Sequence, residues 1–235
     1  MKKSLKYFAA VPAIVLITSF CAFAARGETP ATEQSKLSAD SRYDSYAYLL
    51  DSYDVNIIVN EDNSFDMTEH IGAYFHQARH GITRSIPLKN KVVRLDGTTS
   101  FNRAKITNVT VDAPFSSSVS DGSRVLKIGN ADITLTGAKD YTIAYTYHIG
   151  RDTGKGYDEF YFNLIGDQWD TAIGNVTFTV AMPKAFDASK LGLSHGYKGS
   201  TSSGGITYEV IGNVITGHYE GVLNAGEALT IRLQL

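Results

Sequence analysis

The feature that most constrains this chain is an alternation of apolar and polar residues with a period of two. The clearest run ends just before the turn-forming sequence NEDNS, and its apolar members are Tyr53, Val55, Ile57 and Val59. Successive side chains of a β-strand point to opposite faces, so this run predicts a strand with one buried face. A second alternating run follows the turn, and the two together predict a β-hairpin.

The second run places Phe65, Met67, Ile71, Ala73 and Phe75 on one face, interrupted by Glu69. Similar short runs recur over residues 141–149, 160–164, 176–182, 206–210 and 229–235. Ile106 is out of phase with Val109 and Val111, which indicates a β-bulge. Only AFDASKLGL hints at a helical period. Many short strands separated by Gly, Asn, Asp and Ser predict an all-β fold, an antiparallel immunoglobulin-like β-sandwich.

The N-terminus is typical of an export signal. Three lysines precede an uncharged stretch, residues 7–24, which ends in the small-x-small sequence AFA. We therefore predict a signal peptide over residues 1–24, a polar linker over 25–48 and an extracytoplasmic domain over 49–235. An uncleaved anchor is the alternative, because about 18 apolar residues approach the length of a membrane span. Phe20 is too large to precede a lipidated cysteine at Cys21.

Cleavage after Ala24 would remove Cys21, the single cysteine, and leave a chain without disulfides or thiol chemistry. It would also remove three of the 22 basic residues; the remaining 19 face 24 acidic residues, so the net charge becomes −5. The charge and the lack of a basic run argue against a nucleic-acid partner.

The only tryptophan, Trp169, lies among carboxylates. Asp158 and Glu159 precede it, and Asp167 and Asp170 flank it. Paired acids beside an aromatic ring are the components of a glycosidase, so an envelope hydrolase or carbohydrate-binding protein is one hypothesis. The other is structural: Gly166-Asp167 is typical of a turn, and the ring would fold over the end of the sandwich in the connection between two strands.

Metal and cofactor motifs are weak. His76 and His80 are four residues apart but lack the glutamate of HExxH, and His70 lies just before them. The oxygens of NEDNSFD lack the central glycine and distal glutamate of a calcium loop, although a calcium-stabilised adhesion module remains an alternative. The sequence carries no nucleophile elbow, phosphate loop or dinucleotide fingerprint. We predict no metal site, no cofactor and no catalytic residue.

Two segments together resemble a known family. HGITRSIPL, residues 80–88, is similar to the R-G-I-x-R-x-I-P-L motif of bacterial predicted membrane proteins called domain-of-unknown-function family 2207, and DEFYFNLIGDQWDTAIGNVTFTV, residues 158–180, is similar to its D-E-x-Y-W-N-x-I-G-x-x-W-x-x-P-I run. Likeness to the family's opening hairpin and closing strand extends the match over about residues 50–235. The sequence departs from the motifs at His80, Phe162 and Ala172.

The resemblance implies an exported, extracytoplasmic β-rich domain that is followed by transmembrane helices. It brings no biochemical activity. We expect a non-enzymatic module at the cell envelope that contacts an unidentified protein or polymer, held at the membrane by the signal segment or by C-terminal helices. The candidate binding residues are Arg79, Arg84, Asp167, Trp169 and Asp170. For Arg84 a second interpretation is a sharp crossover between strands, with Gly81 in an unusual conformation and Pro87 ending the pairing.

Overall fold

The computed structural model describes residues 36–93, 97–150 and 159–235. The predicted signal peptide and the first part of the predicted linker lie outside them. The described residues fall within one compact unit, which contains every buried core side chain from Leu37 to Leu233. This unit therefore carries a complete core of its own. None of its helices is long and apolar enough to cross a membrane.

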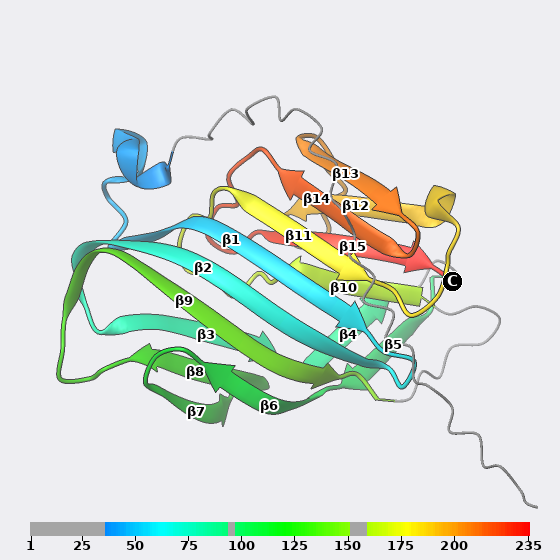
Figure 1. Ribbon diagram of the computed structural model, residues 1–235, viewed down its shortest axis with the longest axis horizontal. Coiled ribbons are helices and arrows are strands. Elements are labelled where there is room, and N and C mark those ends of the chain that lie inside the picture. Colours follow the sequence, from blue (N-terminus) through cyan, green and yellow to red (C-terminus); the bar gives the residue numbers. More distant parts are fainter. Residues whose placement is uncertain (1–35, 94–96, 151–158) are drawn as a thin grey trace, which may run out of the picture. The chain divides into compact units, whose positions relative to one another are not determined.

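A seven-stranded sheet forms the larger layer of the domain. Its strands, in spatial order, are β13 (Ile206–Ile211), β14 (Val214–Tyr219), β11 (Val176–Ala181), β1 (Tyr48–Val59), β2 (Ser64–Arg79), β9 (Leu135–His148) and β6 (Lys105–Val111). Among its pairings β1–β11 is parallel and the others are antiparallel. The long strands β1, β2 and β9 lie side by side (Figure 1).

Smaller sheets supply the remaining strands of the described residues. One has the order β10 (Glu159–Ile165), β15 (Ala228–Gln234), β12 (Leu191–Gly196); another has the order β3 (Gly81–Pro87), β8 (Ser123–Gly129), β7 (Phe115–Ser120). The strands β4 (Lys89–Val93) and β5 (Thr99–Arg103) form a separate hairpin. The described part of the chain also contains three short 3-10 helices, η1 (Leu37–Ala39), η2 (Ser41–Tyr43) and η3 (Ala188–Lys190).

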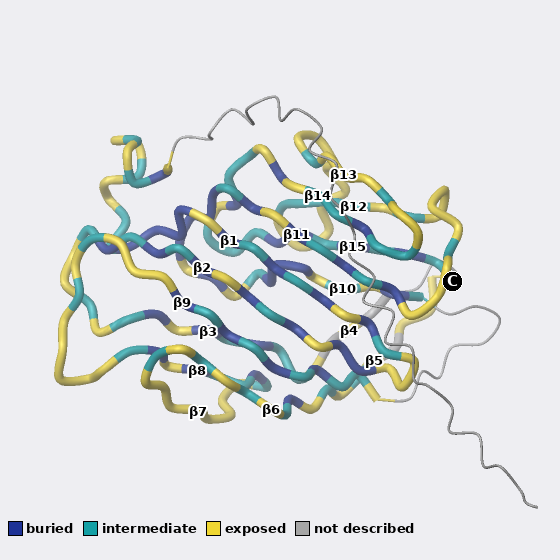
Figure 2. The backbone as a smooth tube through the Cα atoms, in the orientation of Figure 1, coloured by how far each residue is buried: buried dark blue, intermediate teal, exposed yellow. Residues whose placement is uncertain are grey.

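The core lies between the seven-stranded sheet and the two three-stranded sheets. Phe65 of β2 packs edge-on against Phe160 and Phe162 of β10, with ring centroids 5.2 and 5.3 Å apart. Buried and exposed positions alternate along the long strands, as a strand with one covered face requires (Figure 2). The all-β prediction is thus confirmed, whereas the immunoglobulin-like arrangement stays a prediction.

The predicted hairpin is confirmed as β1 and β2, which pair across the NEDNS turn. The bulge expected near Ile106 is also present: the β6–β9 register shifts between Thr107 and Thr110, where Asn108 adopts a φ of 54°. AFDASKLGL, by contrast, forms no α-helix. It forms the single turn η3 and then enters β12, which pairs with β15.

Part of the expected linker is folded onto the domain. The side chain of Leu37 is buried with Leu49 and Ala172, and the backbone and hydroxyl groups of Ser38 donate to Asp51 at 2.8 and 2.6 Å. The polar composition of this segment concealed one apolar anchor, because a single leucine produces no periodic pattern. The folded domain therefore begins before Leu49.

The domain has two ends, at which the candidate sites lie. At the Trp169 end, β1 begins at Tyr48, β2 ends at Arg79 and β10 ends at Ile165. At the hairpin end, β1 ends at Val59 and β15 ends at Gln234, and the hydroxyl of Tyr147 donates to the carbonyl of Pro87 at 2.8 Å. The β4–β5 hairpin follows Pro87 directly and therefore lies at this second end.

Candidate functional site

Trp169 lies in the connection between β10 and β11, as the sequence predicted. Its side chain is only 3% exposed, and its ring packs edge-on against Tyr53 with centroids 5.9 Å apart. Its carbonyl accepts a hydrogen bond from the backbone of Gly226 at 2.9 Å, which ties the connection to the entry of β15. Trp169 therefore closes this end of the core and presents no open stacking platform to a ligand.

Arg84 lies beneath Trp169, inside the core. It is 4% exposed, and its guanidinium donates to the two carboxylate oxygens of Glu69 at 2.8 and 2.7 Å. The guanidinium carbon lies 5.6 Å from the centre of the Trp169 ring. The interpretation of Arg84 as a surface docking residue is corrected here, because β3 turns this side chain toward β2 and away from solvent. Its crossover interpretation fits: β3 runs from Gly81 to Pro87.

Tyrosines surround this buried pair. The hydroxyl of Tyr145 donates to Glu69 at 2.7 Å. The hydroxyl of Tyr53 and the ring nitrogen of Trp169 are also buried, and neither has a hydrogen-bond partner among the described residues. We call Glu69, Arg84, Tyr145, Tyr53 and Trp169 the Arg84 cluster.

Within the Arg84 cluster, Glu69 and Arg84 each stabilise the charged form of the other, as their pKa values show. Burial by itself raises the pKa of Glu69, but the Arg84 charge, its hydrogen bonds and the Tyr145 hydroxyl outweigh burial and hold this pKa below its ordinary value. Burial lowers the pKa of Arg84, but the Glu69 carboxylate more than reverses this effect. Burial, followed by the Glu69 charge, raises the pKa of Tyr145. The pair is therefore ionised and the tyrosine neutral in the folded protein.

Two of the predicted binding residues meet at the surface of the Trp169 end. The guanidinium carbon of Arg79 lies 5.0 Å from the centre of the Tyr48 ring, and the Tyr48 hydroxyl donates to Asp170. Asp170 is exposed and Arg79 half-buried. Burial and then the hydrogen bond to Asp170 raise the pKa of Tyr48, so this tyrosine remains a neutral donor. We call Arg79, Tyr48 and Asp170 the Tyr48 patch.

The base of the Tyr48 patch is fixed by its neighbours. The Tyr48 ring is buried and stacks on Phe75 with centroids 6.0 Å apart, and the Thr171 hydroxyl donates to the Tyr48 carbonyl. Thr171 follows Asp170 in the chain and is itself buried. The patch thus holds a cation over the face of a buried ring and an anion at the hydroxyl of the same ring, an arrangement suited to binding a polar partner.

The other carboxylates do not converge on Trp169. Asp167 is half-buried and accepts from Gln168 at 2.8 Å. Glu159 begins β10 and pairs with Arg232, whereas Asp167 follows the end of that strand. A strand rises about 3.3 Å per residue, so the two ends of β10, Glu159 and Ile165, lie roughly 20 Å apart. Asp158 lies outside the described residues. The facing pair of acids that the hydrolase hypothesis needs is therefore not formed by Glu159 and Asp167 or Asp170.

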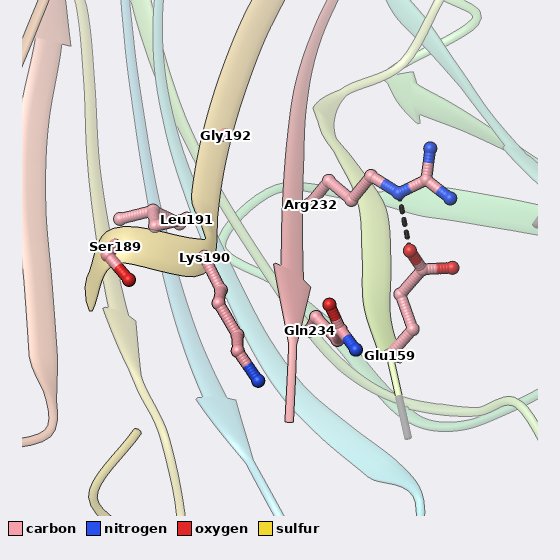
Figure 3. A pocket seen from close by; sticks show the side chains of 7 residues that line it. All are labelled: Glu159, Ser189, Lys190, Leu191, Gly192, Arg232 and Gln234. Atoms are coloured by element: carbon pink, nitrogen blue, oxygen red, sulfur yellow. Dashed lines mark hydrogen bonds and ion pairs between the residues drawn. The ribbon is translucent and has the colours of Figure 1, made fainter. Parts of the chain in front are cut away.

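A shallow pocket at the hairpin end does not form an alternative site. Its volume is about 230 Å³, and it is lined by Glu159, Ser189, Lys190, Leu191, Gly192, Arg232 and Gln234. In Figure 3 the side chain of Arg232 points toward Glu159 and away from Lys190. Arg232 also lies over the ring of Tyr161 at 5.3 Å. The Arg232 guanidinium thus pairs with Glu159, while Lys190 points elsewhere, so the polar groups of the pocket do not converge on a common point.

The histidines and the NEDNSFD turn each have separate local partners. His70 contacts Thr142, His76 packs on Tyr74, and His80 contacts the carbonyl of Ile133. In the turn, Asp62 accepts from the backbone of Ser64 at 3.0 Å and from its hydroxyl at 2.5 Å, which is ordinary turn chemistry. No group of three or more metal-binding side chains occurs within residues 36–93, 97–150 and 159–235.

The family described as the predicted membrane protein (DUF2207) N-terminal domain matches residues 50–235. The chain belongs to this family. The match covers β1 from its third residue to the end of β15, and it contains both the Arg84 cluster and the Tyr48 patch except for Tyr48 itself. The resemblance inferred from the two sequence motifs is therefore confirmed. A DUF2207 domain is by description part of a membrane protein, which supports membrane association.

Solved structures resemble this DUF2207 domain only distantly. Leukotriene A4 hydrolase from Saccharomyces cerevisiae is 12% identical, with a TM-score of 0.45 over 89% of this chain and 32% of the other. A putative protease from Parabacteroides distasonis is 10% identical, with a TM-score of 0.43 over 80% of this chain and 40% of that one. An M1 zinc metallopeptidase from Deinococcus radiodurans is 10% identical, with a TM-score of 0.42 over 79% and 42%.

The chain thus spans between a third and about two fifths of the length of these structures. Similarity at this level carries no argument about activity. None of the curated proteins compared with the chain matches it.

Sequence reasoning missed four residues of these sites, Glu69, Tyr53, Tyr145 and Tyr48, although it placed Tyr53 and Tyr145 on strand faces. Glu69 was detectable, because a charged residue in phase with an apolar face must be paired if that face is buried. Tyr145 lies in phase with the inward residues of β9, and its hydroxyl gave no separate signal. Tyr48 stands in a tyrosine-rich stretch whose register the sequence does not fix.

Proposed function

We propose that this DUF2207 domain is a non-enzymatic, extracytoplasmic module of a membrane protein, and that it contacts an envelope protein or polymer through the Tyr48 patch. The observation that carries the proposal is the meeting of Arg79 and Asp170 on Tyr48 at the surface of the Trp169 end. The family supports membrane association. The immunoglobulin-like sandwich expected from the sequence would suit such a module, and it is part of the proposal.

The chemistry of the Tyr48 patch favours a polar, uncharged partner. Arg79 offers donors and Asp170 offers acceptors, so an amide backbone or a glycan hydroxyl can satisfy both. The buried Tyr48 ring and Thr171 hold these groups in place, so little conformational entropy is lost on binding. A hydrolase, by contrast, would need two of the carboxylates near Trp169 to face each other across the substrate.

Extracytoplasmic placement is tested with fusions that join a reporter after Leu235. Alkaline phosphatase folds and is active only after export, because it needs disulfides. We expect an active phosphatase fusion and an inactive β-galactosidase fusion in a bacterial host. The reverse pattern would place the domain on the cytoplasmic side and overturn this part of the proposal.

Binding at the Tyr48 patch is tested with a photo-crosslinking amino acid at Gln168, which is exposed beside the patch. A discrete adduct is expected in intact cells, and it should disappear with Arg79→Ala or Asp170→Ala. The same probe at Lys184, a residue 75% exposed at the hairpin end, should not give that adduct. An adduct that survives both substitutions would show that the patch is not the contact.

A further inference from the structure

The β4–β5 hairpin presents an unusual surface at the end opposite the Tyr48 patch. In its register Lys89 pairs with Arg103, and Lys91 pairs with Phe101. Directly paired residues, and residues two apart on one strand, point to the same side. One face of the hairpin therefore carries Lys89, Lys91, Phe101 and Arg103 together. We call these four residues the basic face.

The basic face is open to solvent. Phe101 is 77% exposed, the largest value among the exposed large hydrophobic residues of the described chain. Lys89, Lys91 and Arg103 are also exposed. The opposite side of the hairpin faces the protein, because the side-chain oxygen of Asn102 is buried. An exposed aromatic ring surrounded by cations is the combination found on protein surfaces that lie at a membrane interface.

The cations of the basic face have no acidic partners among the described residues. The ion pairs of the described chain involve other basic side chains, Arg42, Arg84, Lys184, His218 and Arg232. The chain as a whole carries a net charge of −2. These three cations, which have no acidic partner among the described residues, surround one exposed ring and form a local reversal of the overall charge.

We propose that the basic face docks onto an anionic lipid bilayer. Cations near a membrane surface are attracted to acidic lipid headgroups, and an exposed aromatic ring enters the interface between headgroups and acyl chains. Phe101 favours a bilayer over a soluble polyanion, because a polyanion offers no apolar layer to receive the ring. Membership of a membrane-protein family agrees with a lipid partner. The proposal does not depend on the partner of the Tyr48 patch.

Docking by this face would orient the domain. Pro87, the end of β15 and the hairpin share one end, and the Tyr48 patch lies at the other. A bilayer beneath the hairpin would therefore leave the Tyr48 patch directed away from the membrane, where a partner can reach it.

The experiment measures co-sedimentation of the compact unit, residues 34–235, with vesicles of equal parts phosphatidylglycerol and phosphatidylcholine. Removing residues 1–33 eliminates the apolar N-terminal segment, which would bind vesicles by itself. We expect binding to these vesicles, weaker binding to pure phosphatidylcholine, and loss of binding as salt rises. Each of Lys89→Gln, Lys91→Gln and Arg103→Gln should weaken partitioning by about fivefold.

The matched controls each change one exposed lysine elsewhere, Lys36→Gln, Lys139→Gln or Lys198→Gln, so that each alters the net charge by the same amount as one hairpin variant. Each control should retain most of the binding. Phe101→Ala should weaken binding to vesicles and leave the melting temperature unchanged, which separates docking from folding. No vesicle binding, or equal losses in the hairpin and control variants, would overturn the proposal. Insensitivity to Phe101→Ala would indicate a soluble polyanion and would equally overturn it.

Discussion

Arg84 of β3 and Glu69 of β2 form a bidentate ion pair inside the core, with N–O distances of 2.8 and 2.7 Å and almost no exposure of either side chain. Such a pair joins the seven-stranded sheet to the smaller β3–β8–β7 sheet. Two buried charges stabilise a fold only while both are present, because either one alone carries an uncompensated desolvation cost.

Arg84→Ala is expected to lower the free energy of unfolding by about 3–5 kcal/mol, since it leaves Glu69 buried and unpaired. Urea denaturation of the wild type and variant measures this loss. Arg79→Ala is the matched surface control and should cost no more than about 1 kcal/mol. The double variant Glu69→Met/Arg84→Met should recover most of the stability. A small loss in Arg84→Ala would show that the pair does not hold the two sheets together.

The same pair makes stability depend on acid pH. The pKa of Glu69 in the folded protein is held below its ordinary value of 4.5. A group with a lowered folded pKa contributes stability above its unfolded pKa and loses that contribution as pH falls through the folded value. The free energy of unfolding should therefore fall as pH drops below 4.5, and Glu69→Gln should flatten part of this slope. Identical slopes in the two proteins would contradict the assignment.

The pairing partners of most strands were not accessible to sequence reasoning, whereas several strand faces were. Tyr53, Val55, Ile57 and Val59 alternate without interruption, so their burial follows from the period alone. The parallel pairing of β1 with β11 depends on contacts between segments more than a hundred residues apart. No local pattern encodes such a contact.

The candidate sites, too, could be predicted from the sequence only in part. The position of Trp169 between two strand runs predicted that its ring covers one end of the core. The structure shows that the ring is buried there. The basic face could not be predicted from the sequence, because it does not form a continuous run of charged residues. Lys89 and Lys91 alternate with other residues, and Arg103 lies beside them only because the two strands pair. Arg84 was ambiguous for a related reason: the sequence does not show that β3 directs it at Glu69.

Trp169→Ala is expected to destabilise the domain by about 3–5 kcal/mol, because it removes a large buried ring and leaves a cavity above Arg84. Trp169→Phe should cost less, since it keeps an aromatic ring against Tyr53. The single tryptophan also supplies its own readout. Its fluorescence should be shifted to the blue and shielded from iodide in the native protein, because the side chain is 3% exposed. Quenching as efficient as that of free tryptophan would contradict the burial.

Gly81→Ala tests the crossover that positions Arg84. Gly81 has a φ of 142°, and a Cβ there would lie 1.9 Å from the carbonyl oxygen of Ile128 on the neighbouring strand. Gly137 also has a positive φ, of 77°, but a Cβ there meets nothing within 4 Å. Gly137→Ala should therefore cost only the backbone strain, about 1 kcal/mol, whereas Gly81→Ala should cost more than about 3 kcal/mol.

Part of the stability lost in Gly81→Ala should come from disturbance of the Arg84–Glu69 ion pair. Relief of the clash requires β3 to move away from β8, and Arg84 lies only three residues along β3. The displacement would loosen the bond to Glu69, so the unfolding free energies of Gly81→Ala, Arg84→Ala and the double variant should not be additive. The double variant should lose less stability than the sum of the single losses. Additive losses would mean that the crossover and the ion pair stabilise the domain independently.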